Sequence, residues 1–266
     1  MPSRSSAVTV VIPARFGSSR FPGKPLAMLL GKPLIQHVYE HARSSRGVGQ
    51  VLIATDDSRI AEAVKGFDGT VVMTTGPFRT GTDRVAAVAR QVTGQTLVNL
   101  QGDEILLHPE LIPDLVTPFL ESGAGMGTLK RRLTSPDDVR NPAVVKVVTD
   151  RTGDALYFSR EPIPHRRDHP AGGREPGLYY MHLGMYIYAR ETLLRLAELP
   201  TGPLEETEQL EQLRALEHGV RIRVWETEHA SLRIDTPEDL ETGAAVLERL
   251  ARREKNAPKI AVGGKA

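Results

Sequence analysis

Short apolar segments alternate with longer amphipathic segments through the first 120 residues. The apolar segments are rich in Val, Ile and Leu, which is typical of buried β-strands. Strands are predicted at Ala7–Pro13, Val51–Thr55, Thr70–Met73 and Thr96–Leu100. The amphipathic segments carry apolar residues at helical spacing, and helices are predicted at Pro33–Ala42, Ser58–Val64, Thr82–Val92 and Pro109–Leu120. This alternation predicts a parallel sheet that helices cover on both faces.

The second half of the chain is less regular. Strands are predicted at Met126–Leu129, Val144–Thr149, Ala155–Ser159, Leu183–Tyr188 and Arg221–Trp225. Helices are predicted at Leu204–His218 and Thr236–Arg252, and a charged loop rich in Pro and Gly at Arg166–Gly177. We therefore expect an α/β fold with about seven mostly parallel strands and a smaller antiparallel extension at about residues 140–190.

The last predicted helix begins with a clear start signal. Thr236 is suited to the N-cap, Pro237 to the first helical position, and Asp239 follows three residues after the cap. Thr82 is interpreted in the same way as a possible cap of its own helix. Residues 253–266 show no apolar periodicity and are predicted as a flexible tail after one domain at 1–252.

Composition narrows the classes of function. The chain has 266 residues, with 34 Lys and Arg against 33 Asp and Glu, for a formal net charge of +1. A general nucleic-acid or membrane-surface binder would need a basic excess. The absence of cysteine excludes disulfides, thiol catalysis and cysteine-ligated metal sites. No apolar run approaches the ~20 residues of a spanning helix, and we expect a cytoplasmic protein.

The loop after the first strand is suited to a triphosphate. It reads A-R-F-G-S-S-R-F-P-G-K-P from Ala14 to Pro25, with Arg15, Arg20 and Lys24 among small residues. Glycine lets the backbone approach phosphate oxygens, and the cations supply charge. A solvated basic loop is the alternative, but the position beyond a strand's carboxyl end favours a site. Neither a Walker loop nor a dinucleotide fingerprint is present.

Two aspartates are candidates for a metal site. Asp103 stands in Q-G-D-E after the fourth predicted strand, and Asp235 opens the turn before the last helix. Mg²⁺ prefers oxygen ligands and bridges phosphate oxygens, so both side chains suit it. Each aspartate alone is as well explained by helix capping. The hypothesis therefore requires that the two carboxylates meet in the fold.

Nine ordered motifs between Val11 and Leu240 extend this picture. They read V-I-P-A-R-x-x-S-x-R-x-P-G-K-P-L, A-T-D, G-T-D-R, Q-G-D-E, N-P-x-x-V-K-V-V, A-L-Y-F-S-R-x-x-I-P, H-L-G-x-Y, L-E-Q-L-R and I-D-T-P-E-D-L. With these motifs the chain resembles the 3-deoxy-manno-octulosonate cytidylyltransferases of the lipopolysaccharide pathway. The resemblance covers nearly the whole chain except its two ends.

The resemblance implies a Rossmann-like nucleotidyltransferase fold and a set of site residues. Its implied nucleotide contacts are Arg15, Ser18, Arg20, Lys24, Thr82, Arg84 and Gln101, with Gln101 near cytosine. Its implied sugar-acid contacts are Arg160, His182, Tyr186, Glu211 and Gln212. Asp103 and Asp235 would hold Mg²⁺, and together with Arg15 and Lys24 they form the implied catalytic set. The alternative to a sugar-acid contact is that His182 and Tyr186 are structural residues of the core.

The implied reaction is transfer of CMP from CTP to a sugar acid with release of pyrophosphate. The resemblance also implies a homodimer, with the extension at about 140–190 carrying the acceptor site and a dimer contact. No residue stands out as a general base; His182 is a candidate.

Two positions depart from the family pattern. Ile105 follows Glu104 where Pro is usual, and Met181 precedes His182 where many members carry Lys or Arg. The acceptor could therefore be a different sugar acid of specialised metabolism, or an 8-amino variant. A nucleotide-binding homologue without turnover is a further alternative, which the joint presence of Arg15, Lys24 and the two aspartates disfavours. An oxidoreductase is disfavoured because the glycine fingerprint is missing.

Overall fold

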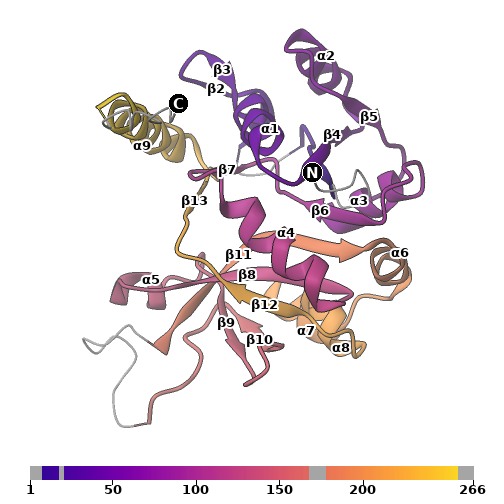
Figure 1. Ribbon diagram of the computed structural model, residues 1–266, viewed down its shortest axis with the longest axis vertical. Helices are drawn as coiled ribbons and strands as arrows, with labels where there is room; N and C mark the ends of the chain where they lie inside the picture. The colour runs from indigo at the N-terminus through magenta and orange to yellow at the C-terminus, as the bar shows by residue number, and fades with distance from the viewer. Residues whose placement is uncertain (1–7, 18–20, 168–177, 257–266) are drawn as a thin grey trace, which may run out of the picture.

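Strand β1 (Val8–Pro13) lies inside the main sheet, and both its neighbours run parallel to it. The computed structural model describes residues 8–17, 21–167 and 178–256, and within these ranges the sheet has nine strands. The order is β10-β9-β11-β6-β1-β4-β5, and β8 pairs with β11 and β12 (Figure 1). The other parallel strands of this central part are β4 (Val48–Thr55), β5 (Val71–Met73) and β6 (Thr96–Asn99).

Helices cover both faces of the sheet, because β1 is apolar on both sides. Val10 and Ile12 are fully buried in one cluster, and Val11 is fully buried in another. Such a strand is stable only between two layers of apolar side chains. The first cluster includes α1 (Leu34–Ser44), α2 (Ser58–Gly66) and α4 (Leu111–Ser122). The second includes α3 (Gly81–Ala89), α6 (Arg190–Glu198) and α8 (Leu213–Glu217).

The predicted antiparallel extension is confirmed. Its longest strand, β11 (Tyr180–Ala189), runs antiparallel to three neighbours and joins the extension to β6. The remaining strands are β8 (Met126–Arg132), β9 (Lys146–Thr149), β10 (Ala155–Ser159) and β12 (Arg223–Glu226). The α/β fold with a parallel centre and antiparallel strands beside it is therefore the one that the sequence indicates.

A second, two-stranded sheet joins distant parts of the chain. Strand β7 (Glu104–Leu106) pairs antiparallel with β13 (Ser231–Arg233). The pairing continues past the strand ends, where the backbone N–H of Ile234 donates to the carbonyl of Asp103 at 3.0 Å. Ile105, where the family pattern has Pro, is fully buried in this ladder. The sheet therefore brings the end of β6 next to the turn before α9 (Pro237–Asn256).

The start of α9 is the predicted capping box. Asp239 N–H donates to Thr236 Oγ1 at 3.3 Å, and Thr236 N–H donates to Asp239 Oδ2 at 2.8 Å. The helix continues to Asn256, four residues beyond its predicted end, so 253–256 are helical. Residues 257–266 of the predicted tail lie outside the described residues. No helix in the described ranges is long and apolar enough to cross a membrane.

Several local predictions are wrong. The predicted helix at 204–218 is two short helices, α7 (Pro203–Glu208) and α8, because Gln209 adopts a left-handed conformation with φ 53°. The cap of α3 is Thr80, whose Oγ1 accepts from Asp83 N–H, while Thr82 is already helical. The pattern does not indicate the hairpin β2 (Met28–Leu29) and β3 (Lys32–Pro33), the 3₁₀ turn η2 (Lys24–Leu26), or α5 (Pro136–Arg140). Residues 168–177 of the predicted loop lie outside the described residues.

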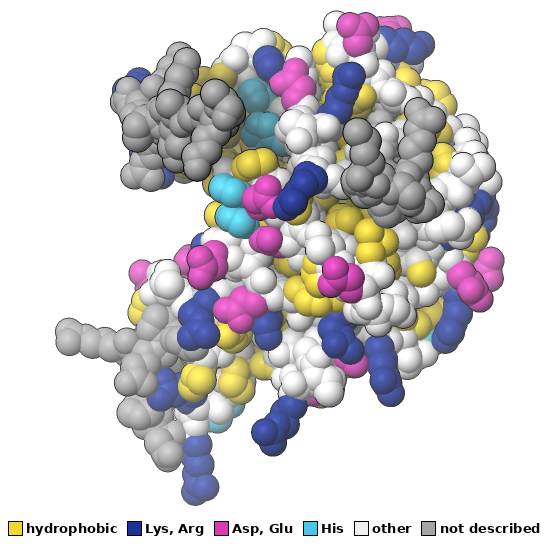
Figure 2. Space-filling model, in the orientation of Figure 1, with side chains coloured by type: hydrophobic (Ala, Val, Ile, Leu, Met, Phe, Trp, Pro, Cys, Tyr) yellow, Lys and Arg dark blue, Asp and Glu magenta, His cyan; other side chains and the backbone are white. Residues whose placement is uncertain are grey.

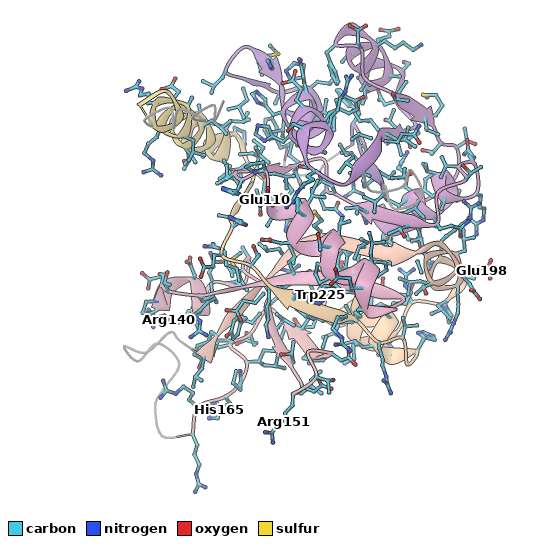
Figure 3. All side chains as sticks on the ribbon, in the orientation of Figure 1. Glu110, Arg140, Arg151, His165, Glu198 and Trp225 are labelled. Atoms are coloured by element: carbon cyan, nitrogen blue, oxygen red, sulfur yellow. The ribbon has the colours of Figure 1, made fainter. Side chains whose placement is uncertain are left out.

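Gly127 on β8 tests the packing between the sheet and α4. A Cβ at this position would lie 2.4 Å from the indole ring of Trp225 on β12 (Figure 3). This ring packs edge-on against Phe119 of α4. Gly127→Ala is expected to lower the free energy of unfolding by about 1–3 kcal/mol, because the partly buried ring must move away from the core side chains against which it packs. Urea unfolding measures this loss. The control Gly66→Ala, in α2 with open space around its Cα, is expected to be neutral or stabilising.

Candidate active site

A cavity of about 610 Å³ opens beyond the carboxyl ends of β1 and β6. This is the edge at which sites of parallel α/β sheets are found. Residues far apart in the chain line it: Pro13 to Arg15 after β1, Gln101 to Glu104 after β6, and Asp235 before α9. Ten of the predicted site residues line this one cavity, namely Arg15, Lys24, Gln101, Asp103, Arg160, His182, Tyr186, Glu211, Gln212 and Asp235.

The two predicted metal ligands meet at the side chain of Lys24. Lys24 Nζ lies 2.5 Å from Asp103 Oδ2 and 3.1 Å from Asp235 Oδ1. All three side chains are partly buried, with 12 %, 18 % and 21 % exposed. Because one ammonium group contacts both carboxylates, Asp103 and Asp235 lie on either side of a space that a cation fills. The meeting that the metal hypothesis requires is therefore present.

Lys24 reaches this position through the local geometry of its loop. Gly23 has φ 73°, in the left-handed region that favours glycine, and its N–H donates to the carbonyl of Phe16 at 2.9 Å. A Cβ on Gly23 would meet the Phe16 ring at 3.1 Å. The guanidinium of Arg59 also stacks on the Phe16 ring, 3.3 Å from the ring centroid. The loop thus closes on itself and delivers Lys24 to the cavity.

His182 and Tyr186 of β11 form part of the cavity wall and are also core residues. His182 is 8 % exposed, and its Nε2 lies 3.0 Å from Thr128 Oγ1. Burial lowers the pKa of His182 to about 3, so its ring is neutral at pH 7. Burial raises the pKa of Tyr186 well above its usual value, so its hydroxyl stays protonated. His182 and Tyr186 are therefore core residues that also line the cavity, and their contact with a sugar acid stays a prediction.

Glu211 and Gln212 both face the cavity, because the chain between α7 and α8 is not helical. The carboxylate of Glu211 accepts from Thr82 N–H at 3.5 Å. Burial raises the pKa of Glu211, and hydrogen bonds from Thr80 and Thr82 partly oppose this rise. Gln212 is 4 % exposed, and its Nε2 has no hydrogen-bond partner among the described residues. This buried amide is suited to donate to an oxygen of a bound substrate.

Arg160 lines the cavity but is already bound to the backbone. Its Nε donates to the carbonyl of Glu208 at 2.8 Å, Nη1 to Pro142 at 3.0 Å, and Nη2 to Gln209 at 3.3 Å. These three bonds use three of the five N–H donors of a guanidinium. The predicted carboxylate contact of Arg160 thus depends on the other two.

Two further predicted contacts are outside the wall. Thr82 and Arg84 do not line the cavity: Thr82 accepts from Asn99 Nδ2 at 3.3 Å, and Arg84 donates to Thr74 at 2.7 Å and to Asp56 at 3.0 Å. Their direct contact with a nucleotide stays a prediction. Ser18 and Arg20 lie outside the described residues.

Met181 is also absent from the cavity wall. Its side chain packs with the small apolar cluster of Leu133, Val139 and Tyr179, and its sulfur lies 3.4 Å from Arg131 Nη2. The departure from the family pattern at this position therefore does not remove a cation from the cavity.

Sequence reasoning missed several charged residues of the wall: Arg79, Glu104, Glu205, Arg214 and Arg233. Arg233 Nε lies 3.1 Å from Asp235 Oδ2, which brings a second cation to the aspartate pair. Three of the five adjoin a quoted motif or lie in one: Glu104 in Q-G-D-E, Arg214 in L-E-Q-L-R, and Arg233 just before I-D-T-P. Their place in or beside a motif is the feature of the sequence that could have identified these three residues.

The donor set of the aspartate pair fits a hard divalent cation. Asp103 and Asp235 offer oxygen only, which Mg²⁺ prefers, and Mg²⁺ is commonly held by one or two carboxylates together with substrate phosphates. Among the described residues, no group of three or more His, Cys, Asp or Glu is arranged to hold a metal alone. The pair therefore suits a cation that arrives with a triphosphate.

Charge outside the cavity is mixed in sign. Lys and Arg side chains alternate with Asp and Glu over the face that Figure 2 displays, in keeping with the net charge of +1. A field of one sign, which a general nucleic-acid binder needs, is not seen on this face.

Comparison with known proteins identifies relatives over nearly the whole chain. Residues 9–222 match the family model described as cytidylyltransferase. A 3-deoxy-manno-octulosonate cytidylyltransferase of Geobacter sulfurreducens is 51 % identical over 252 residues, covering 91 % of this chain and 99 % of its own. The protein of the same name from Anaeromyxobacter sp. is 54 % identical over 242 residues, covering 90 % and 96 %.

Solved structures agree with these relatives. CMP:2-keto-3-deoxy-manno-octonic acid synthetase complexed with CTP superimposes with a TM-score of 0.84 at 41 % identity, covering 92 % of this chain and 99 % of that one. A glucose-1-phosphate thymidylyltransferase from Bacillus anthracis has a TM-score of 0.62 at 18 % identity, covering 90 % and 95 %, and shares the fold alone.

The buried His182 predicts a pH dependence of stability. Its pKa is about 3 in the folded chain and near the ordinary 6.5 in the unfolded chain. The unfolded state therefore binds the proton first as the pH falls below 6.5, and this group's stabilising contribution is lost at up to about 1.4 kcal/mol per pH unit. Urea unfolding of wild type and His182→Gln between pH 7 and 4.5 measures it; the variant should have the shallower slope. His165→Gln, at an exposed side chain (Figure 3), should keep the wild-type slope, and equal slopes in all three proteins would contradict the prediction.

Proposed function

Since the chain belongs to the cytidylyltransferase family, we propose that it transfers CMP from CTP to 3-deoxy-manno-octulosonate and releases pyrophosphate. The observation that carries the proposal is the cavity in which Asp103 and Asp235 meet beside Lys24, at the carboxyl ends of β1 and β6. The relatives that bear this activity in their names span almost their whole length against this chain. The product would serve the pathway of lipopolysaccharide synthesis.

The reaction needs one bond made and one broken. The hydroxyl on the anomeric carbon of the sugar acid attacks the α-phosphorus of CTP in line and forms the new oxygen–phosphorus bond. The bond from the α-phosphorus to the oxygen that bridges to the β-phosphate breaks, and pyrophosphate leaves with that electron pair. The hydroxyl proton passes to solvent. Catalysis of this kind rests on positioning and on neutralising oxygen charge.

The chain's own residues divide this work between two sides of the cavity. Arg15 and Lys24 bring positive charge to the phosphates on the side of β1. Tyr186, Glu211 and Gln212 hold the hydroxyls and carboxylate of the acid on the side of β11 and α8. His182 is a poor base at neutral pH, because burial lowers its pKa to about 3. It therefore acts in binding and orientation.

We also propose that Asp103 and Asp235 hold Mg²⁺ together with the triphosphate. When bound, the ion supplies charge neutralisation at the phosphates and makes a coordinated hydroxyl more acidic.

A cytoplasmic homodimer stays part of the proposal. Leu156 on β10 and Leu178 before β11, 62 % and 57 % exposed, are apolar side chains of the extension that a second copy would cover.

The acceptor is tested by pyrophosphate release with CTP and a panel of acids. 3-Deoxy-manno-octulosonate is expected to give the highest kcat/KM. Release only with its 8-amino variant or with another keto sugar acid would assign the chain to specialised metabolism. No release with any acid, with CTP still bound, would favour a non-catalytic homologue and overturn the proposal.

Removing either carboxylate is expected to abolish most of the rate. Asp103→Asn and Asp235→Asn should each lower kcat by at least about 100-fold, the scale of losing one preorganised charge contact in a transition state. Steady-state pyrophosphate release at saturating CTP measures this. The control Asp57→Asn, at the N-cap of α2, should retain wild-type kcat. Near-normal turnover in both site variants would contradict the proposed roles.

The contacts of Lys24 predict how tightly the aspartate pair binds a divalent cation when no nucleotide is present. Its ammonium contacts both carboxylates, so a divalent cation must compete with it unless phosphates draw it away. Lys24→Met should bind Mn²⁺, the spectroscopic substitute for Mg²⁺, about tenfold more tightly than the wild type in the absence of CTP, because an uncompensated carboxylate pair is left behind. Electron paramagnetic resonance of free Mn²⁺ measures this without any turnover. Lys32→Met, at a surface ion pair, is the control, and equal Mn²⁺ affinity in all three proteins would refute the competition.

A further inference from the structure

Two residues of the quoted motifs have no role in the mechanism above, and they contact each other. Asp83 is the acidic residue of G-T-D-R at the start of α3, and Arg214 is the last residue of L-E-Q-L-R in α8. Arg214 Nη1 donates to Asp83 Oδ1 at 3.1 Å, across 131 positions of the chain. One motif adjoins the nucleotide side of the cavity and the other adjoins the acceptor side.

Arg214 is fixed by two carboxylates from different helices. Its side chain is 2 % exposed, and its Nε and Nη2 form a paired contact with Glu205 of α7, at 2.7 and 2.5 Å. A planar guanidinium that makes such a forked contact has one orientation. Its third nitrogen is therefore directed at Asp83, and the same side chain joins α7, α8 and α3.

Asp83 is equally constrained on the α3 side. Arg79 Nε lies 3.0 Å from Asp83 Oδ2, and Asp83 N–H donates to the Thr80 cap at 3.3 Å. Asp83 is thus part of the first turn of α3, whose residues Thr80 and Gly81 line the cavity. The buried charges of this group are Arg214, Asp83 and Glu205, and the more exposed Arg79, at 45 %, supplies the second cation beside the two carboxylates.

The segment that Arg214 holds cannot set its own geometry. Helices α7 and α8 have six and five residues, too short to be stable without outside contacts. Between them the chain turns at Gln209, with φ 53°, and then presents Glu211 and Gln212 to the cavity. Glu211 also reaches α3, where it accepts from Thr82 N–H. Both connections therefore end on the first turn of α3.

We propose that Arg214 is a positioning residue that sets the acceptor wall against the nucleotide side of the cavity, through its ion pairs with Glu205 and Asp83. The inference rests on the proposed function and names the residue that fixes Glu211 and Gln212 for the sugar acid. It acts through these side chains and holds the first turn of α3 and the α7–α8 segment in one arrangement. The acceptor should therefore be bound less well when the link is cut, while CTP retains its own contacts at Arg15 and Lys24.

The sharpest variant is Asp83→Asn, because it weakens the link to α3 and leaves the Arg214–Glu205 pair intact. KM for the sugar acid is expected to rise about tenfold, the typical worth of one hydrogen bond between charged groups, while KM for CTP changes by less than about twofold. Asp83→Glu, which restores the charge, should recover most of the loss. The matched control is Asp154→Asn, which cuts an Arg–Asp pair away from the cavity, 2.7 Å to Arg223; its carboxylate is 16 % exposed, close to the 11 % of Asp83.

A second measurement does not depend on turnover. Hydrogen exchange of residues 203–217 in the full chain without ligands should be faster in Asp83→Asn than in the wild type and in Asp154→Asn, with α2 unchanged in all three. Equal shifts in both KM values, or unchanged exchange at 203–217, would overturn the inference. A wild-type protein without activity toward any acid would instead remove the proposed function, and the exchange result would still decide whether Asp83 anchors α7 and α8.

Discussion

The active-site arrangement depends on two like charges that are held side by side. Asp103 and Asp235 are more than a hundred positions apart in the chain, and both contact the ammonium of Lys24. Two carboxylates that contact the same ammonium group are close enough to repel each other. The fold must therefore hold them in place and supply positive charge to offset the repulsion. The holding is done by backbone: the β7–β13 ladder, extended by the bond from Ile234 N–H to the Asp103 carbonyl. The compensation comes from Lys24, with Arg233 adding a contact to Asp235.

This division is suited to the proposed exchange of cations at the aspartate pair. Strand β7 is buried, and Ile105 and Ile234 are fully inaccessible; the backbone pairing of β7 with β13 does not depend on which cation lies between the carboxylates. Lys24, in contrast, comes from a loop in which Gly23 N–H donates to the Phe16 carbonyl, and it reaches the aspartate pair through its long side chain. An anion pair held by backbone pairing, beside a cation on a long side chain, is suited to a reaction in which a triphosphate and its ion enter and pyrophosphate leaves.

The parts of the fold that the sequence predicts best are those set by local pattern. Val10, Val11 and Ile12 are apolar in succession, which indicates a strand buried on both faces, and the two core clusters confirm it. Thr236 and Asp239 form the predicted capping box because its contacts lie within three residues. The strands β7 and β13 were missed because three residues each carry too little periodicity, and their partners are more than a hundred positions away. The motifs nevertheless brought Asp103 and Asp235 into one hypothesis, which the geometry supports.

The acceptor side could not be predicted in the same way, for a physical reason. The residues 204–218 have helical spacing, and local propensity alone gives one helix there. The break at Gln209 exists because distant groups bind the two halves separately: Arg214 reaches Asp83, Glu211 reaches Thr82, and Arg160 donates to the carbonyls of Glu208 and Gln209. Each contact satisfies a buried charge or carbonyl that a continuous helix would place elsewhere. A conformation fixed by non-local ion pairs cannot be recognised from the periodicity of its own segment. The nucleotide side lies at the ends of strands, and those strands are clearly indicated by their runs of apolar residues. Sequence patterns therefore identify where the triphosphate chemistry lies earlier than they identify which acid is recognised.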